Sequence, residues 1–241
     1  MNTLHIELRK EKRTGVSLVL IAVGIFGALY AFMNFIVRKE ALLNLPLPPM
    51  DVLLTQLYGV IMILNLFGIV VASCIIYSME FKGNAGKKMY LLPISVSRMY
   101  FSKFVIVTVT LFVAIAIQNI ALMKIGIMEL PAGTFEPGTL ISFALYSFIT
   151  SMPVLSFMLL IASRFENIWI PLGIGVAGFL SAMALATVKT ELLLIHPFVV
   201  MFRPAVAMSA EPNPMIVVVS IVETNLFFAA ELYVSKELRY E

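Results

Sequence analysis

The chain has 241 residues, of which 61% are hydrophobic and only 13% are charged, and its formal net charge is +3. A water-soluble domain carries about 25% charged residues, so this composition excludes an ordinary soluble protein and indicates a membrane protein. The basic balance does not point to a nucleic-acid partner, because membrane proteins concentrate Lys and Arg on their cytoplasmic side. An open strand cannot satisfy its backbone in lipid, so we expect an all-α membrane protein.

The first stretch of the chain, residues 1–14, is polar and basic and precedes the first apolar run. We expect a short interfacial helix here, with Leu4 and Leu8 towards lipid and the basic residues towards phosphate groups. The alternative is a basic tail that only fixes the orientation of the chain. The other residues assigned to this helix are Glu7, Lys10, Lys12 and Arg13.

Six apolar runs follow, each long enough to cross a bilayer as a helix of about 20 residues. Five of them contain no charged residue, whereas the last contains Glu223 and Glu231. We expect Glu231, the nearer of the two to the end of its run, only to solvate the helix end. The predicted transmembrane helices cover residues 16–37, 52–79, 104–123, 139–163, 168–188 and 215–234.

A further apolar stretch, residues 192–202, lies between the fifth and sixth predicted spans and is interrupted by His196 and Pro197. This stretch is too short to cross the hydrocarbon. It therefore predicts a pair of short re-entrant or interfacial helices before the sixth span.

The distribution of the 17 Lys and Arg residues predicts the orientation. Most of them lie in segments that share one side of the membrane with the N-terminus when six spans are counted. Because basic residues concentrate inside, we expect a multi-pass protein of the plasma membrane with both termini in the cytoplasm.

The longest polar interval between two spans, residues 80–103, separates the second span from the third. Leu92 offers an apolar anchor, and Pro93 would end a short helix before it. The basic residues of this interval can pair with acidic groups of a partner protein or hold the loop to anionic lipid. Its glycines lack the spacing of a phosphate-binding loop, so we expect no nucleotide site in this chain.

Polar residues inside the spans predict a candidate cavity. Glu223 lies well within the last span, where a charge costs about 2.5–3.5 kcal/mol on insertion scales. Such a residue normally faces the bundle interior or a watery cavity. It could contact a polar or cationic substrate, or it could be a protonated carboxyl bonded to a neighbouring helix. The residues assigned to this cavity are Asn65, Gln118, Glu223 and Asn225.

The sequence offers no metal site and no catalytic group. Its two histidines, His5 and His196, lie far apart and form no metal-binding motif, and Cys74 is its single cysteine. We therefore expect neither a metal nor a cofactor in this chain.

Two motifs carry a resemblance to a known family. Glu80, Gly83, the run Leu91-Leu92-Pro93-Ile94-Ser95, Arg98 and Lys103 resemble the first cytoplasmic loop of type-2 ATP-binding-cassette (ABC) permeases. The run from Glu7 to Thr14 is similar to the start of the lantibiotic-immunity and bacitracin-resistance permeases. The order of the apolar runs also matches, including the interrupted stretch before the last span.

The resemblance implies the permease subunit of an ATP-driven exporter in a bacterial plasma membrane. It implies a separate ATPase subunit that holds the ATP and Mg²⁺, a second permease chain, identical or paralogous, and an amphipathic antimicrobial or toxin peptide as cargo. A coupling helix between the second and third spans would contact the ATPase. The residues implied in this contact are Glu80, Gly83, Lys87, Lys88, Leu92, Pro93, Arg98 and Lys103.

Two other classes of protein fit the composition. The first is the substrate-binding membrane subunit of a small-molecule importer, against which the long basic loop argues. The second is an intramembrane enzyme, against which the lack of paired acidic and histidine motifs argues.

Overall fold

The computed structural model of the protein describes residues 3–81, 96–185, 188 and 190–237. Within these residues every regular element is a helix. The elements are α1 (Thr3–Thr14), α2 (Val16–Leu43), α3 (Pro49–Asp51), the π-helix η1 (Val52–Gln56), α4 (Tyr58–Phe81), α6 (Val96–Glu129), α7 (Pro137–Ala162), α8 (Trp169–Leu185), the 3-10 helix η3 (Glu191–Ile195), α9 (Pro197–Val206) and α10 (Pro214–Glu237).

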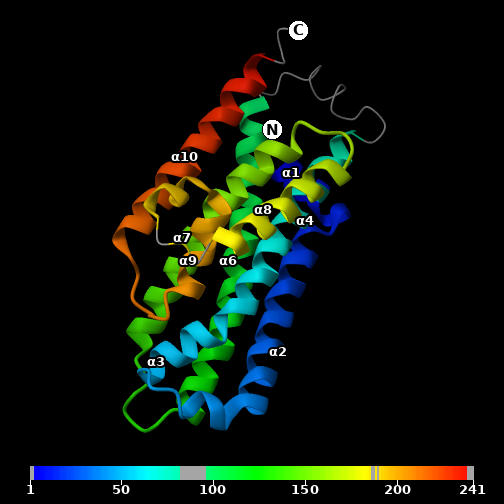
Figure 1. Cartoon of the computed structure of the whole chain (residues 1–241). Coiled ribbons are helices and arrows are strands. Elements are labelled where there is room, and N and C mark those ends of the chain that lie inside the picture. The colour runs from blue at the N-terminus through cyan, green and yellow to red at the C-terminus, as the bar shows by residue number, and fades with distance from the viewer. Residues whose placement is uncertain (1–2, 82–95, 186–187, 189, 238–241) are drawn as a thin grey trace.

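The long helices lie side by side in one bundle (Figure 1). One end of the bundle carries α1, the start of α6 and the last turns of α10, and we call it the termini end. The opposite end carries α3 and the end of α6, and we call it the far end. Among the described residues, five helices are long and apolar enough to cross a membrane. They cover Val16–Leu43, Pro49–Met79, Ser97–Glu129, Pro137–Ala162 and Pro214–Val234.

The fifth predicted span, residues 168–188, corresponds to α8, which has 17 residues. It is apolar but shorter than the five helices named above. The third predicted span begins at residue 104, whereas α6 begins at Val96 and runs for 34 residues. The helix starts earlier than hydropathy predicts because its first turns contain polar and charged residues that are helical nonetheless. The expected coupling helix between the second and third spans falls outside the described residues.

Helices α2 and α6 approach each other closely where α2 carries two glycines. A Cβ atom at Gly24 would lie 2.9 Å from the Cα atom of Ala114, and one at Gly27 would lie 2.7 Å from Nε2 of Gln118. Only glycine fits at Gly24, because the nearest atom belongs to the backbone of α6, whereas a side chain at Gly27 would have to displace the end of the Gln118 side chain. Small residues are the usual means by which membrane helices come this close. The two glycines therefore bring α2 against the middle of α6.

The stretch before α10 contains two short helices, η3 and α9, as its interrupted hydropathy predicts. They are separated at His196. Helix α9 does not lie on the surface: Phe198, Val199, Val200 and Met201 are all buried. It is thus a packed element of the bundle, in contact with α7 and α8.

Candidate functional site at the termini end

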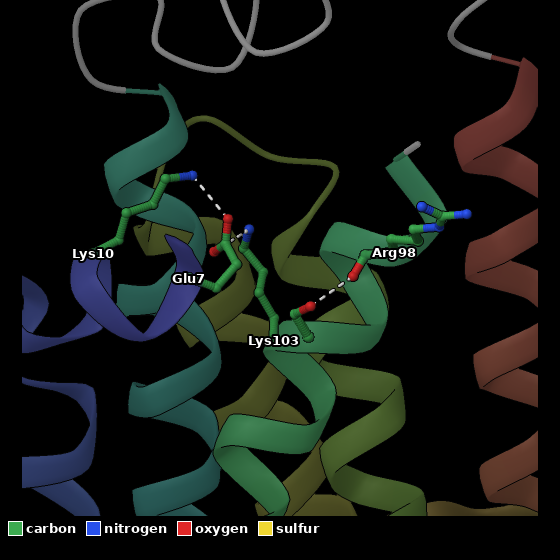
Figure 2. A network of polar contacts seen from close by, with 5 residues as sticks. Glu7, Lys10, Arg98 and Lys103 are labelled. Atoms are coloured by element: carbon green, nitrogen blue, oxygen red, sulfur yellow. Dashed lines mark hydrogen bonds and ion pairs between the residues drawn. The ribbon is translucent and has the colours of Figure 1, made fainter. Parts of the chain in front are cut away.

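A buried ion pair joins α1 to α6 at the termini end (Figure 2). The Nζ atom of Lys103 lies 3.2 Å from Oε2 of Glu7, and the two side chains are 1% and 4% exposed. Lys10, one turn further along α1, places its Nζ atom 2.8 Å from Oε1 of the same carboxylate. The Glu7 carboxylate therefore receives a cation on each oxygen, which is the arrangement that a buried charge requires.

Helix α4 contributes an aromatic ring to the same cluster. The Lys103 ammonium lies 5.2 Å from the centroid of the buried Tyr77 ring, within the range of a cation–π contact. Tyr77 belongs to the last turns of α4, and Lys103 to the second turn of α6. We call Glu7, Lys10, Lys103 and Tyr77 the termini cluster; it connects α1, α4 and α6.

A second buried acidic residue, Glu11, lies on the same face of α1 as Glu7. Glu11 is buried, and its carboxylate accepts a hydrogen bond from the Ser17 hydroxyl at the start of α2. The Ser17 hydroxyl lies 3.4 Å from that of Thr110 on α6. The chain turns between α1 and α2 at Gly15, whose φ of 75° suits glycine.

The outer face of α1 partly follows the expectation of an interfacial helix. Leu8 is 41% exposed, Arg9 is exposed and Leu4 is half-buried. Lys12 and Arg13 lie in the last turn of α1. What the sequence did not predict is the inward acidic face, because its basic partner lies far along the chain.

The residues expected to contact an ATPase divide into three groups. Arg98 is exposed in the first turn of α6, and Figure 2 shows its side chain pointing away from Glu7 and Lys103. Lys103 is buried under α1 and α4, which corrects the expectation that it meets a partner protein. Glu80 belongs to the last turn of α4. The others, Gly83, Lys87, Lys88, Leu92 and Pro93, lie outside the described residues.

A second ion pair at the termini end joins α10 to the segment that follows α7. Glu231 is 2% exposed, and its Oε2 accepts hydrogen bonds from the Arg164 guanidinium and, at 3.0 Å, from the Ser163 hydroxyl. The expectation that Glu231 only solvates a helix end is therefore wrong. The presence of an acid inside an apolar run was the available signal, but the sequence did not identify its partner.

Two residues of the candidate cavity bind each other in the interior of the bundle. Asn65 of α4 donates to Oε1 of Gln118 at 3.0 Å, and Gln118 of α6 donates to Oδ1 of Asn65 at 2.7 Å. Gln118 also donates to the backbone carbonyl of Val23 at 3.4 Å. Both amides are buried, and each donates to and accepts from the other, so the pair connects α4 and α6 and reaches α2 through Val23.

The other two residues of the candidate cavity are not joined to this pair. Glu223 is 7% exposed, and its Oε2 atom has no hydrogen-bond partner within the described part of the chain. Asn225 is exposed and donates to the carbonyl of Ile221, one turn back, at 2.7 Å. The two side chains of α10 thus differ in burial, and neither bonds with Asn65 or Gln118.

Comparison with known proteins places the chain in a family. A family model described as ABC-2 family transporter protein matches residues 3–182, which include α1, the termini cluster, α2, α4, α6, α7 and most of α8. The chain belongs to this family. It is the membrane permease subunit of an ABC transporter and a multi-pass membrane protein, and family membership implies an ATPase partner. No curated protein and no solved structure matches the chain.

Family membership confirms the resemblance to type-2 ABC permeases that the loop motif indicates. It identifies a transport subunit rather than an enzyme, and so argues against the intramembrane enzyme considered above.

Proposed function

We propose that this permease is one half of an ATP-driven exporter that expels amphipathic antimicrobial or toxin peptides from a bacterial plasma membrane. The similarity of residues 7–14 to the lantibiotic-immunity and bacitracin-resistance permeases supports the cargo class. ATP and Mg²⁺ bind the ATPase partner, and a second permease chain, identical or paralogous, completes the transport unit. Residues 82–95, together with Arg98, form the surface that meets the ATPase.

The termini cluster is the observation that carries this proposal. Residues 82–95 connect α4 to α6 in the sequence. Tyr77 of α4 contacts the Lys103 ammonium, and Lys103 belongs to α6. A push on the segment would therefore move α1, α4 and α6 together, because coupling travels through contiguous packed and hydrogen-bonded groups. A permease driven by an external ATPase needs such a connection between its docking surface and its spans.

The proposed topology has six crossings with both termini in the cytoplasm. Arg164 is paired with Glu231 at the termini end, whereas the backbone N–H of Ala210 donates to Asp51 at the far end at 2.7 Å. The chain between Arg164 and Ala210 must connect the two ends, and α8 is its longest helix. At about 1.5 Å per residue, 17 residues extend about 25 Å, near the lower limit for a spanning helix.

Glu223 is the proposed point of contact with a cationic group of the cargo. Its buried carboxylate has an oxygen with no partner among the described residues, and an acid within a span usually marks a substrate path. Asn65 and Gln118 satisfy each other instead, so we assign them to bundle packing near this path rather than to cargo binding.

A charge-reversal experiment tests the docking surface. We expect Lys87→Glu with Arg98→Glu to leave insertion intact, to lower co-purification with the ATPase and to abolish export, because opposed charges steer this association. The matched control is Arg38→Glu with Lys124→Glu, which reverses two exposed cations outside this surface. Full ATPase binding and full export by the Lys87→Glu, Arg98→Glu variant would exclude this surface as the docking site.

A further inference from the structure

Helices α7 and α10 pack side by side, and two contacts fix their register (Figure 1). The rings of Phe157 on α7 and Phe227 on α10 have centroids 5.3 Å apart. Further along both helices, the Ser163 hydroxyl that follows α7 donates to Oε2 of Glu231 at 3.0 Å. The residue numbers rise together in the two contacts, so the two helices run in the same direction.

This register places Glu223 opposite Pro153. Glu223 precedes Phe227 by one turn on the same face of α10, and Pro153 precedes Phe157 by one turn on the same face of α7. A helical side chain points back towards the start of its helix. The Glu223 carboxyl is therefore directed towards the turn of α7 that begins at Ile149.

Pro153 leaves a backbone acceptor free in this turn. A proline has no N–H, so the carbonyl of Ile149 lacks the donor that would occupy it in an uninterrupted helix. Two buried hydroxyls of the same region, those of Thr150 and Ser220, each donate to a carbonyl of their own helix, at 3.1 and 2.7 Å. Each hydroxyl hydrogen is thus already engaged, and what these groups offer across the helix contact is oxygen.

Glu223 lacks a donor as well. Its side chain is 7% exposed, and its Oε2 atom has no hydrogen-bond partner within the part of the chain that the structure describes. An ionised carboxylate in such a place loses its hydration without replacement, which is costly. A protonated carboxyl instead has an O–H donor, and the Ile149 carbonyl is an acceptor without one. One added hydrogen therefore satisfies both groups.

We propose that Glu223 is protonated in the resting permease, donates its hydrogen to the Ile149 carbonyl, and exchanges its proton for the cationic group of the cargo. The exchange rests on the proposed function, since it requires a cationic cargo, whereas the resting hydrogen bond does not. In the exchange the carboxyl O–H bond breaks and the proton passes to water, while a cargo ammonium donates to the carboxylate and to the carbonyl. The site is neutral before and after, so no net charge is buried.

Other ionisable groups belong to α10 and to the elements packed against it, but none of the described ones bonds with the Oε2 atom of Glu223. Glu231 is paired with Arg164, and Arg203 of α9 donates to the Val188 carbonyl at 3.2 Å. We therefore expect the pH dependence of cargo binding to follow Glu223. The remaining groups are Tyr146 on α7, Glu191 on η3, His196 before α9, Tyr233, Lys236 and Glu237 on α10, and Arg98, Tyr100, Lys103, Lys124 and Glu129 on α6.

Infrared spectroscopy of the full chain in detergent tests the resting hydrogen bond, because a protonated carboxyl has a carbonyl stretch separate from the carboxylate bands. We expect such a band in wild type and its loss in Glu223→Gln. Pro153→Ala returns an N–H to the Ile149 carbonyl and should shift the band. The matched control is Pro171→Ala, in the first turn of α8, where an N–H has no helical partner; it should leave the band in place. Absence of the band in wild type, or a band that Pro153→Ala does not shift, would overturn the proposal.

Proton release on binding tests the exchange. A cationic amphipathic peptide is added to the permease in weakly buffered detergent that contains a pH-indicator dye. We expect one proton to be released for each bound peptide in wild type and in the control Glu231→Gln, and none in Glu223→Gln. The affinity of wild type should rise by up to about tenfold per pH unit while Glu223 is protonated, because the departing proton is taken up more readily at higher pH. Glu223→Gln should remove this dependence.

The exchange and the proposed cargo fail in different ways. Peptide binding to wild type without proton release would overturn the exchange and leave the cargo class standing. If no cationic amphipathic peptide binds, the cargo class is wrong and the exchange falls with it, while the infrared band still decides the resting hydrogen bond.

Discussion

Helix α6 is held by an ion pair near each of its ends, and the two pairs differ in burial. At the termini end, Lys103 and Glu7 are 1% and 4% exposed. At the far end, Lys39 of α2 pairs with Glu129, and the two are 48% and 32% exposed. An exposed pair contributes about 0–1 kcal/mol, whereas removal of one partner from a buried pair costs about 3–5 kcal/mol. The same chemistry thus fixes α6 firmly at the termini end and only loosely at the far end.

The largest expected effect comes from Glu7→Leu. This variant removes the carboxylate from the buried Lys103 ammonium, and we expect the free energy of unfolding to fall by about 3–5 kcal/mol. Denaturant unfolding of the purified permease in detergent measures it. The double variant Glu7→Leu, Lys103→Met should recover most of the loss, because an apolar pair can replace a buried ion pair. A small loss in the single variant would mean that the pair is not buried in the folded protein.

A smaller loss is expected for Glu231→Gln. The amide retains the shape of the carboxylate but loses its charge opposite Arg164, which is 21% exposed and so partly hydrated. We expect a loss of about 1–3 kcal/mol. Thermal unfolding at low and high salt gives the measurement. A loss as large as that of Glu7→Leu would show that the Glu231–Arg164 pair stabilises the termini end as much as the Glu7–Lys103 pair does.

Gln118→Leu compares the contribution of the neutral Asn65–Gln118 pair to the free energy of unfolding with the contributions of the ion pairs. It leaves the buried Asn65 amide without its partner, and we expect a loss of about 1 kcal/mol, since hydrogen bonds between membrane helices contribute modestly. The double variant Asn65→Leu, Gln118→Leu should be closer to wild type, because no buried amide is then left unpaired. An equal or greater loss in the double variant would contradict the pairing of these two residues.

The smallest effect is expected for Lys39→Ala at the far end. The pair with Glu129 is exposed, so its loss should change the free energy of unfolding by about 0–1 kcal/mol and less at high salt. Glu129→Gln should behave in the same way. A loss comparable with that of Glu7→Leu would remove the contrast between the two ends of α6.

Hydropathy predicts much of the helical arrangement. A segment that crosses lipid carries apolar side chains, and it must form a helix so that its backbone groups hydrogen-bond within the segment. The runs beginning near Val16, Val52, Thr139 and Met215 all fall in long helices. The start of α6 was missed because Arg98 and Lys103 interrupt the apolar run, although polar residues continue a helix readily. Hydropathy reports the environment of side chains and not the course of the backbone.

The site was harder to predict because its partners are distant in sequence. The sequence marked Glu7 and Lys103 separately, one as part of an interfacial helix and the other as part of a docking loop. Their contact depends on how α1 folds back across α6, for which no local pattern exists. The same reason explains Asn65 and Gln118, which were assigned to one cavity with Glu223 and instead bind each other.

The length of α6 has a mechanical consequence. The helix contains no proline, and its 34 residues extend about 51 Å, more than the membrane is thick. Gly24 brings α2 against it at Ala114, about 27 Å from Val96 and about 22 Å from Glu129. A rigid rod pivoting there is a lever with nearly equal arms. A sideways displacement of the end of α6 at the termini cluster would then move its far end by almost the same distance in the opposite direction.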